Sequence, residues 1–307
     1  MQSLSSPIFA TLPMELVNLV LWHAAHASTP MDLASLARLA LVSRHSNGLA
    51  TPLLYSTIVL DSAPKFKAFQ NVLIAKSAAF FARYFQQLSI SLPLTSPDER
   101  AMQSLIGLGA ALSFVQAPLD LLLDMQHVES EIRPWRKLSI LRSTLINSSP
   151  YPLDPELLSA LFMGATHLHF GGQTIHELYL FCGRVFTRSD RFNLTHLSLD
   201  ADSVALLWDD DARRAWVARL DAYLTLPNLE RIVLRIPRCD VARVGSSFLR
   251  MLAASIADER VFVHFDSSWD PQGAASFAVD GWKRHVSGLQ DLWTSGSPVK
   301  DLEEYSA

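Results

Sequence analysis

The spacing of hydrophobic residues divides the chain into two parts. Up to residue 56, leucines and valines recur at three- and four-residue intervals, which predicts helices. From residue 57, short runs in which apolar and polar residues alternate precede longer helical patterns, and each such run predicts a strand. The pattern therefore predicts an all-helical module at 7–56, an α/β region at 57–286 and a C-terminal tail at 287–307.

Eight candidate strands share one apolar position, which we call the anchor of the strand. The anchors are Ile58, Leu88, Leu119, Leu138, Leu168, Leu197, Ile232 and Val261. Most neighbouring anchors lie about thirty residues apart, the period of a solenoid of strand–helix units with a parallel sheet. The interval between Leu119 and Leu138 is too short for a full crossover helix, so one of these strands is misassigned or that unit is truncated.

The predicted first helix is more apolar than a helix that faces a single core. One arc of its surface holds Met14, Leu16, Val17, Leu19, Val20 and Leu21, and Trp22 extends the arc. This arc is about twice as wide as the stripe that one core-facing helix needs. A module of about fifty residues cannot bury both sides of such a helix. Part of the arc therefore faces either another protein or the rest of this chain, and periodicity alone leaves both possibilities open.

The helical part contains the stretches LPMELVNLVL, MDLASLARLALVSR and NGLATPLLYSTIVL. Together they resemble the F-box, especially that of the F-box proteins abundant in mushroom-forming fungi. The resemblance implies that these residues build the module or contact the Skp-type adaptor of a cullin-RING ubiquitin ligase. The implied adaptor-binding residues are Leu12, Pro13, Leu16, Leu19, Val20, Leu21, Leu33 and Leu36, and the match extends to Leu39, Leu41 and Val42. The chain departs from the family at Ser46, where the family often has tryptophan.

In the second part, the phrases LTHLSLD and LPNLERIVL resemble the strand of a leucine-rich repeat, although the asparagine ladder of that repeat is absent. The resemblance implies an irregular leucine-rich-repeat-like array behind the F-box. It also implies a substrate-recognition subunit of an SCF-type ubiquitin ligase, in which the array binds a target protein. The alternative is a non-catalytic repeat protein, for interaction or structure, whose F-box-like helices cap the solenoid and bind no adaptor.

A row of basic residues directly precedes the later anchors. The row, which we call the basic row, consists of Lys137, His167, His196, Arg231 and Arg260. Equivalent positions on parallel strands lie about 4.8 Å apart, and neighbouring like charges repel, so the row predicts an acidic or phosphorylated target. Arg235 joins these target-binding candidates from a mixed row with Gly171, Asp200 and His264. The competing interpretation is a solvated sheet face of chance composition.

Composition narrows the classes of partner. The formal net charge of −4 gives no basic excess, so we expect no nucleic acid partner. The two cysteines, Cys182 and Cys239, are too few for a disulfide scaffold. The N-terminus has no positive stretch before an apolar core, and polar residues interrupt the apolar stretch at 101–119. We therefore expect no membrane partner and a cytoplasmic or nuclear location.

No motif predicts catalysis. His167 and His169, like His23 and His26, have the spacing of paired metal ligands, but no cysteine or carboxylate accompanies them in ligand spacing. The sequence has no nucleophile elbow, HExxH motif or P-loop. We therefore expect no enzyme activity, no catalytic residue, no metal and no cofactor.

Tryptophans gather late in the chain, at Trp208, Trp216, Trp269, Trp282 and Trp293. We predict that most of them lie in the core or cap the final repeat, since a solenoid must shield its open end. The tail from Gly296 is acidic, and its composition predicts fraying.

Overall fold

The computed structural model describes only part of the chain. The described residues are 14–27, 33–91, 112–119, 121–122, 135–141, 161–171, 192–200, 217–218, 220–237, 251–256, 258–266, 281–282, 284–285 and 291–301.

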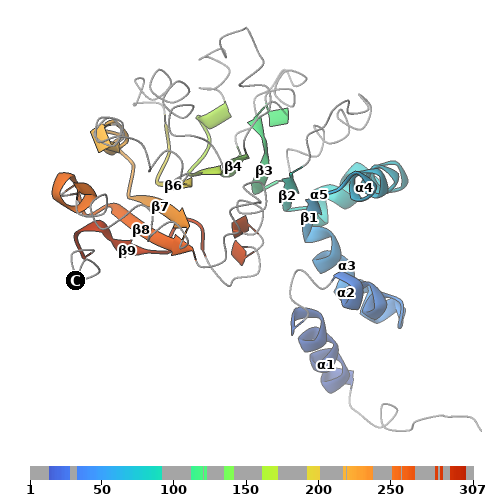
Figure 1. Cartoon of the computed structure of the whole chain (residues 1–307). Coiled ribbons are helices and arrows are strands. Elements are labelled where there is room, and N and C mark those ends of the chain that lie inside the picture. Colours follow the sequence, from blue (N-terminus) through green and yellow to red (C-terminus); the bar gives the residue numbers. More distant parts are fainter. Residues whose placement is uncertain are drawn as a thin grey trace, which may run out of the picture.

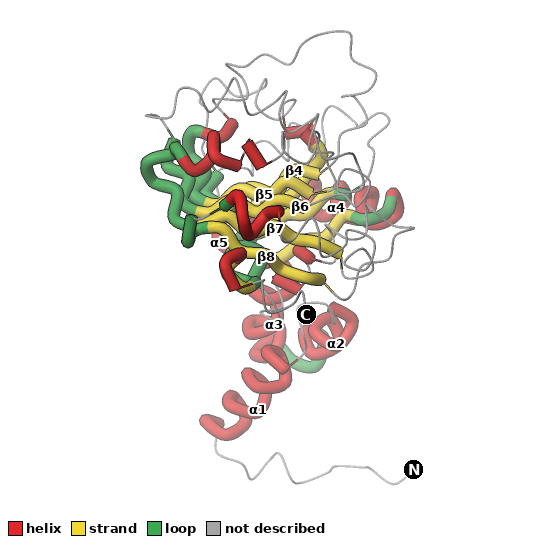
Figure 2. Tube along the Cα trace, turned by 60° about the vertical axis from the view of Figure 1, so that its left-hand side comes forward, coloured by secondary structure: helices red, strands yellow, loops and turns green. Residues whose placement is uncertain are grey.

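Three helices form the N-terminal part: α1 (Met14–Ala27), α2 (Leu33–Ala40) and α3 (Arg44–Ser56). Helix α3 packs against both α1 and α2. In Figures 1 and 2, α1 lies at the end of the molecule away from the sheet. The prediction of helices up to residue 56 is thus confirmed, while Leu12, Pro13 and residues 28–32 lie outside the described residues.

The chain from α3 onward builds a nine-stranded sheet in which the strands follow the order of the sequence. The strands are β1 (Thr57–Leu60), β2 (Gln87–Ile90), β3 (Phe114–Pro118), β4 (Lys137–Leu141), β5 (His167–Gly171), β6 (His196–Asp200), β7 (Arg231–Pro237), β8 (Val261–Asp266) and β9 (Ser297–Pro298). Neighbouring strands pair in parallel, except that β8 and β9 are antiparallel. Figure 1 follows the sheet from β1, beside the helices, to β9. The chain is therefore a mixed α/β protein with a mostly parallel sheet, as predicted.

The register places every predicted anchor except Leu119 in one row. Ile58 pairs with Leu88, and the same row continues from Leu138 through Leu168 to the last anchor, in β8. The pattern succeeds here because each strand buries its anchor in the same core, so that the apolar position recurs in register.

The strand predicted around Leu119 is wrong. The strand is β3, and its Val115 takes the anchor position between Leu88 and Leu138. Leu119 follows this strand and is buried in the main core. The pattern misled because all five residues of β3 are buried, so that they do not alternate, whereas the leucines after Pro118 mimic a buried strand.

Two hydrophobic clusters cover the two faces of the sheet. The larger one contains the anchors and the residues two positions after them, and α4 (Ala63–Ala75) and α5 (Ala78–Tyr84) pack on it. The smaller one consists of Phe114, Trp282, Leu292 and Trp293. Because Phe114 directly precedes an anchor, alternation along the strand places this cluster on the opposite face, which we call the polar face.

Residues 296–301 are not frayed, contrary to the prediction, while the rest of the predicted tail, 302–307, lies outside the described residues. Ser297 and Pro298 form β9, and Val299 is buried in the main core. Trp293 is only 1% exposed. Composition suggested fraying because the segment is polar overall, but its few apolar side chains are buried against the sheet, which offsets the entropy of ordering it. We call residues 291–301 the strap.

Candidate protein-binding surfaces

An apolar surface on α1 and α2 is open in this structure. Its members are Leu16 (46% exposed), Leu19 (51%), Val20 (51%), Trp22 (46%) and Leu33 (41%). Leu41 and Val42, in the turn after α2, are more exposed still. Leu21 is half-buried. The wide arc read from the sequence thus divides into a side that contacts α3 and a side that the described part of the chain leaves uncovered.

Leu36 differs from the other predicted adaptor contacts because it is buried, at 2% exposed. It lies in α2, which packs against α3, where Ser46 and Ala50 are completely buried. Leu36 therefore holds the helices together and is not part of the open surface.

Ser46, the position at which the chain departs from the F-box pattern, has a structural role that the sequence reasoning missed. The Ser46 N–H donates to Ser43 Oγ (3.0 Å), and the Ser43 N–H donates to Ser46 Oγ (2.9 Å). This reciprocal pair is a capping box, which satisfies N–H groups that the first turn of a helix leaves unpaired. The spacing of two serines, S-x-x-S, at the start of α3 was the available signal.

The basic row exists as predicted for four of its five residues. The strand register aligns Lys137, His167, His196 and Arg231 on successive strands β4 to β7. Arg260 departs from this row because its guanidinium binds Asp258 and the carbonyls of the preceding unit, as described next.

Arg260 stabilises the chain before β8. Its Nη2 donates to Asp258 Oδ2 (2.6 Å) and to the Leu224 carbonyl (2.9 Å), and its Nη1 donates to the Leu229 carbonyl (3.0 Å). The row considered only the position before each anchor and overlooked Asp258, two residues earlier, whose carboxylate binds the guanidinium.

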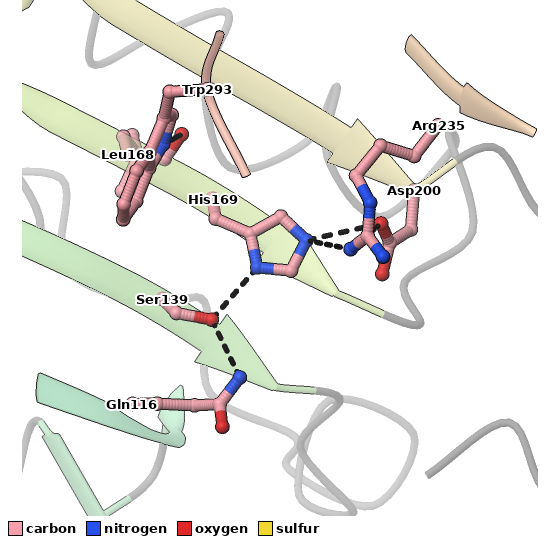
Figure 3. Close-up of polar contacts among 7 residues, drawn as sticks. All are labelled: Gln116, Ser139, Leu168, His169, Asp200, Arg235 and Trp293. Atoms are coloured by element: carbon pink, nitrogen blue, oxygen red, sulfur yellow. Dashed lines mark hydrogen bonds and ion pairs between the residues drawn. The ribbon is translucent and has the colours of Figure 1, made fainter. Parts of the chain in front are cut away.

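The strap covers the basic row. The indole of Trp293 meets the His167 ring edge to face (5.1 Å between centroids), and Lys137 Nζ lies 5.2 Å from the Trp293 centroid. Trp293 Nε1 donates to the Leu168 carbonyl (3.2 Å), as Figure 3 shows. Arg231 Nη2 donates to the carbonyl of Thr294 (2.8 Å). The polar face is therefore filled by the chain itself at this point.

His167 and His196 stack with their rings 4.4 Å apart and 3° from parallel. The Thr166 hydroxyl donates to the Arg136 carbonyl and lies 2.9 Å from His167 Nδ1, so Nδ1 carries the hydrogen and donates to Thr166 Oγ1. The Thr195 hydroxyl, which donates to the Thr166 carbonyl, fixes the same tautomer in His196.

Both stacked imidazoles are held neutral. Burial, and then the neighbouring His196 and Lys137, lower the pKa of His167 to about 4. Burial is also the main cause that lowers the pKa of His196, with Arg231 adding to it. The basic row therefore carries its positive charge at its two ends, on Lys137 and Arg231, at neutral pH.

A buried chain of polar side chains crosses the polar face beside the basic row (Figure 3). It runs from Ser89 through Gln116, Ser139, His169 and Asp200 to Arg235, and each of these residues is at most 4% exposed. The contacts are Ser89 Oγ to Gln116 Oε1 (2.7 Å), Gln116 Nε2 to Ser139 Oγ (3.0 Å), Ser139 Oγ to His169 Nδ1 (2.8 Å), His169 Nε2 to Asp200 Oδ1 (3.0 Å) and Arg235 Nη1 to Asp200 Oδ1 (2.9 Å).

One tautomer of His169 fits the contacts from Ser89 to Asp200. Because Ser139 Oγ accepts from the Gln116 amide, its own hydrogen is available to His169 Nδ1, and His169 Nε2–H then donates to Asp200. Arg235 Nη1, which also lies 3.2 Å from His169 Nε2, then donates to the carboxylate and not to the imidazole. All donors from Ser89 to His169 thus point toward the carboxylate, an arrangement in which each bond polarises the next.

Ser139, His169 and Asp200 are linked in the same order as the nucleophile, base and orienting carboxylate of a catalytic triad. However, these three side chains are buried. Ser139 and His169 are completely buried, so no substrate reaches the hydroxyl in this structure. Arg235, predicted to contact a target, is also completely buried, and a Cβ on Gly281 would lie 2.5 Å from its Nη2. The chain of hydrogen bonds therefore joins neighbouring strands from β2 to β7, and Gly281 lies against its Arg235 end.

No model of a known protein family matches the sequence, and no curated protein matches it. Within the part of the chain that the structure describes, no helix is long and apolar enough to cross a membrane. Among the same residues, no group of three or more histidine, cysteine, aspartate or glutamate side chains could hold a metal ion.

Proposed function

We propose that this chain is a substrate-recognition subunit of an SCF-type ubiquitin ligase, in which α1 and α2 bind a Skp-type adaptor and the sheet region binds a target protein. The observation that carries the proposal is the open apolar surface of Leu16, Leu19, Val20 and Leu33. Leu16, Leu19 and Val20 share one face of α1 by their spacing, and neighbouring apolar side chains that a folded chain leaves in water mark protein interaction sites. The F-box resemblance of the same residues supports an adaptor as the partner.

The position of α1 favours this proposal over the alternative, in which the helices only cap the repeats. Helix α3 contacts α5 and β1, whereas the exposed side of α1 points into solvent at the far end of the molecule (Figure 2). A cap would bury its apolar side against the first repeat, because shielding that repeat is what a cap does. Of the three N-terminal helices, α3 takes that position, next to β1 and α5.

The first experiment measures capture of a purified Skp-type adaptor by the full chain. Replacing Leu16 and Val20 by aspartate puts two charges in the centre of the surface, and we expect affinity to fall at least about a hundredfold. The matched control is Ile74→Asp, since Ile74 is equally apolar, is 86% exposed, and lies on α4 outside this surface. Undiminished capture by the Leu16→Asp, Val20→Asp chain would contradict the proposal.

Hydrogen exchange separates the two functions directly. If α1 binds an adaptor, its side chains on the open surface are wet in the isolated chain, and the amides of α1 gain protection only when the adaptor is added. If the helices are only a cap, protection in α1 is the same with and without the adaptor, and that result would favour the alternative.

A further inference from the structure

Residues 291–296 lie on the basic row in the way that a bound peptide would. They contribute one carboxylate, one aromatic ring and two main-chain carbonyls to it. These groups contact side chains of the sheet and of residues 284–285.

The aromatic ring fills a slot. Phe114, His167 and His285 surround the Trp293 indole, with ring centroids 5.3, 5.1 and 5.0 Å away. The indole N–H donates to the main chain of β5, at Leu168 (3.2 Å), and Lys137 lies against the ring. Such a slot selects tryptophan, because a smaller ring would lack this donor and leave part of the slot empty.

The carboxylate of Asp291 supplies the negative charge that the basic row predicts of its ligand. Asp291 Oδ1 lies 3.7 Å from His285 Nδ1, and its charge also acts on His167, His196 and Arg231. Burial tends to raise the pKa of Asp291, but hydrogen bonds from the strap N–H groups and the nearby cations outweigh burial and lower it. The carboxylate is therefore ionised where it accepts from the N–H groups of Trp293 (2.8 Å) and Thr294 (3.3 Å), beside His285.

The contacts of the strap with Arg231 use only the main chain of the strap. Arg231 donates to the carbonyls of Thr294 (2.8 Å) and Ser295 (3.4 Å), which any extended peptide could offer. The segment then turns away at Gly296, whose φ of 102° is disfavoured for other residues, and continues into β9. Recognition thus rests on the aspartate and the tryptophan, two positions apart, with the buried Leu292 between them.

We propose that the basic row is a peptide-binding site for a segment with an aspartate two residues before a tryptophan, and that residues 291–296 occupy this site as an internal competitor. A target protein that carries such a segment displaces the strap and takes its place on Lys137, His167, His196 and Arg231. That this segment belongs to a ubiquitination target rests on the proposed function, whereas the site itself does not.

The test uses the full chain and a blocked peptide with the sequence of residues 291–298, DLWTSGSP. Gly296→Ala opens the strap, because a Cβ at Gly296 would lie 2.6 Å from the Val263 carbonyl oxygen. Gly48→Ala is the matched control, because a Cβ there meets nothing within 4 Å. We expect the Gly296→Ala chain to bind the fluorescent peptide at least about tenfold more tightly than the control, by anisotropy.

Altered peptides test the chemistry of recognition. On the opened chain, peptides with Asp291→Asn or Trp293→Ala should each bind at least about tenfold more weakly than the parent peptide. A second opened chain, Trp293→Ala, repeats the measurement with the slot itself vacated. If neither opened chain binds the parent peptide better than the control, or if the Asn peptide binds as tightly as the parent, the site is not the one proposed.

The oligomeric state and the adaptor capture of the Gly296→Ala chain complete the test. If the Gly296→Ala chain forms a dimer and binds no free peptide, the strap of a second copy fills the basic row. That result would contradict the proposal that a separate target protein binds there. Adaptor capture by the same variant should be unchanged, because Gly296 lies in the strap and not in α1 or α2. If the chain captures the adaptor but binds no peptide, only the proposed peptide site is wrong. If it binds the peptide but captures no adaptor, only the proposed ligase function is wrong.

Discussion

The two candidate binding surfaces differ in polarity and in solvent exposure, and each departs from what is usual in a folded protein. The surface on α1 and α2 is apolar and open, whereas the basic row on the sheet is polar and covered by the strap. In an isolated chain, apolar groups are expected inside and charges outside. The proposed adaptor would cover the surface on α1 and α2, whereas the strap already contacts the basic row.

The largest expected effect comes from the tryptophan of the covered surface. Trp293→Ala removes a completely buried ring from the smaller cluster and should lower the free energy of unfolding by about 3–5 kcal/mol. Trp22→Ala, on the open surface, should change it by no more than about 0.5 kcal/mol. Urea denaturation of both variants measures the contrast, and equal losses would erase the distinction between the two surfaces.

A similar loss is expected from the buried ion pair next to the basic row. Arg235→Met leaves the Asp200 carboxylate buried without the guanidinium 2.9 Å away, and should cost about 3–5 kcal/mol. Replacing both residues, Arg235→Met with Asp200→Leu, should recover much of that loss, because no charge is then left buried. The double variant is therefore the control, and a double variant less stable than the single one would contradict this account.

Acid should weaken the covered surface before the open one. The pKa of His167 is about 4 in the folded chain and 6.5 ordinarily, so the folded state binds fewer protons between these values. The stabilisation is complete above pH 6.5 and is lost as the pH falls toward 4, by at most about 3 kcal/mol for this residue. Hydrogen exchange of 291–301 against pH measures the loss.

The matched pair for this measurement is His167→Phe and His45→Gln. His167→Phe keeps a ring against Trp293 but removes the titration, so it should flatten the pH dependence. His45→Gln, an exposed position on α3, should leave the pH dependence as it is. A pH profile that His167→Phe does not alter would show that another group controls the strap.

The smallest expected effect concerns the cap of α3. Ser46→Ala removes one half of the capping box and should lower the free energy of unfolding by about 1 kcal/mol. Urea denaturation again measures it. Asn47→Ala serves as the comparison, since the Asn47 side chain makes only exposed contacts, to the Ala40 carbonyl and the Thr51 hydroxyl (3.2 Å each). If Ser46→Ala costs no more than Asn47→Ala, the box does not stabilise α3.

How far the sequence could lead differs between the elements. The alternation of side chains in a strand and the recurrence of one anchor are properties of short segments, so they predicted the sheet and its register. The same reasoning failed at β3, because Phe114 is apolar at the position where β4 to β7 carry a basic residue, so the alternation on which the prediction depends is absent there.

The candidate sites were harder to predict than the elements. The row Lys137, His167, His196 and Arg231 followed from the register, but Arg260 did not join it, because a nearby aspartate and two carbonyls bind its guanidinium. The buried polar chain was missed, since Ser139, His169 and Asp200 come from three strands and show no motif in the sequence. Ser46 showed a signal that was read only as a departure from the F-box.

The sequence by itself determined which residues form helices and strands, that the strands stack in parallel, and that one helix is too apolar for its own module. Strands follow from a period of two residues, helices from a period of three to four, and the repeated strand–helix unit from a period of about thirty. Each of these periods can be read directly along the sequence. Only the tertiary structure decided that the basic row is covered. The hydrogen bond from Trp293 to Leu168 joins residues 125 positions apart, and no local pattern encodes a contact between such distant segments.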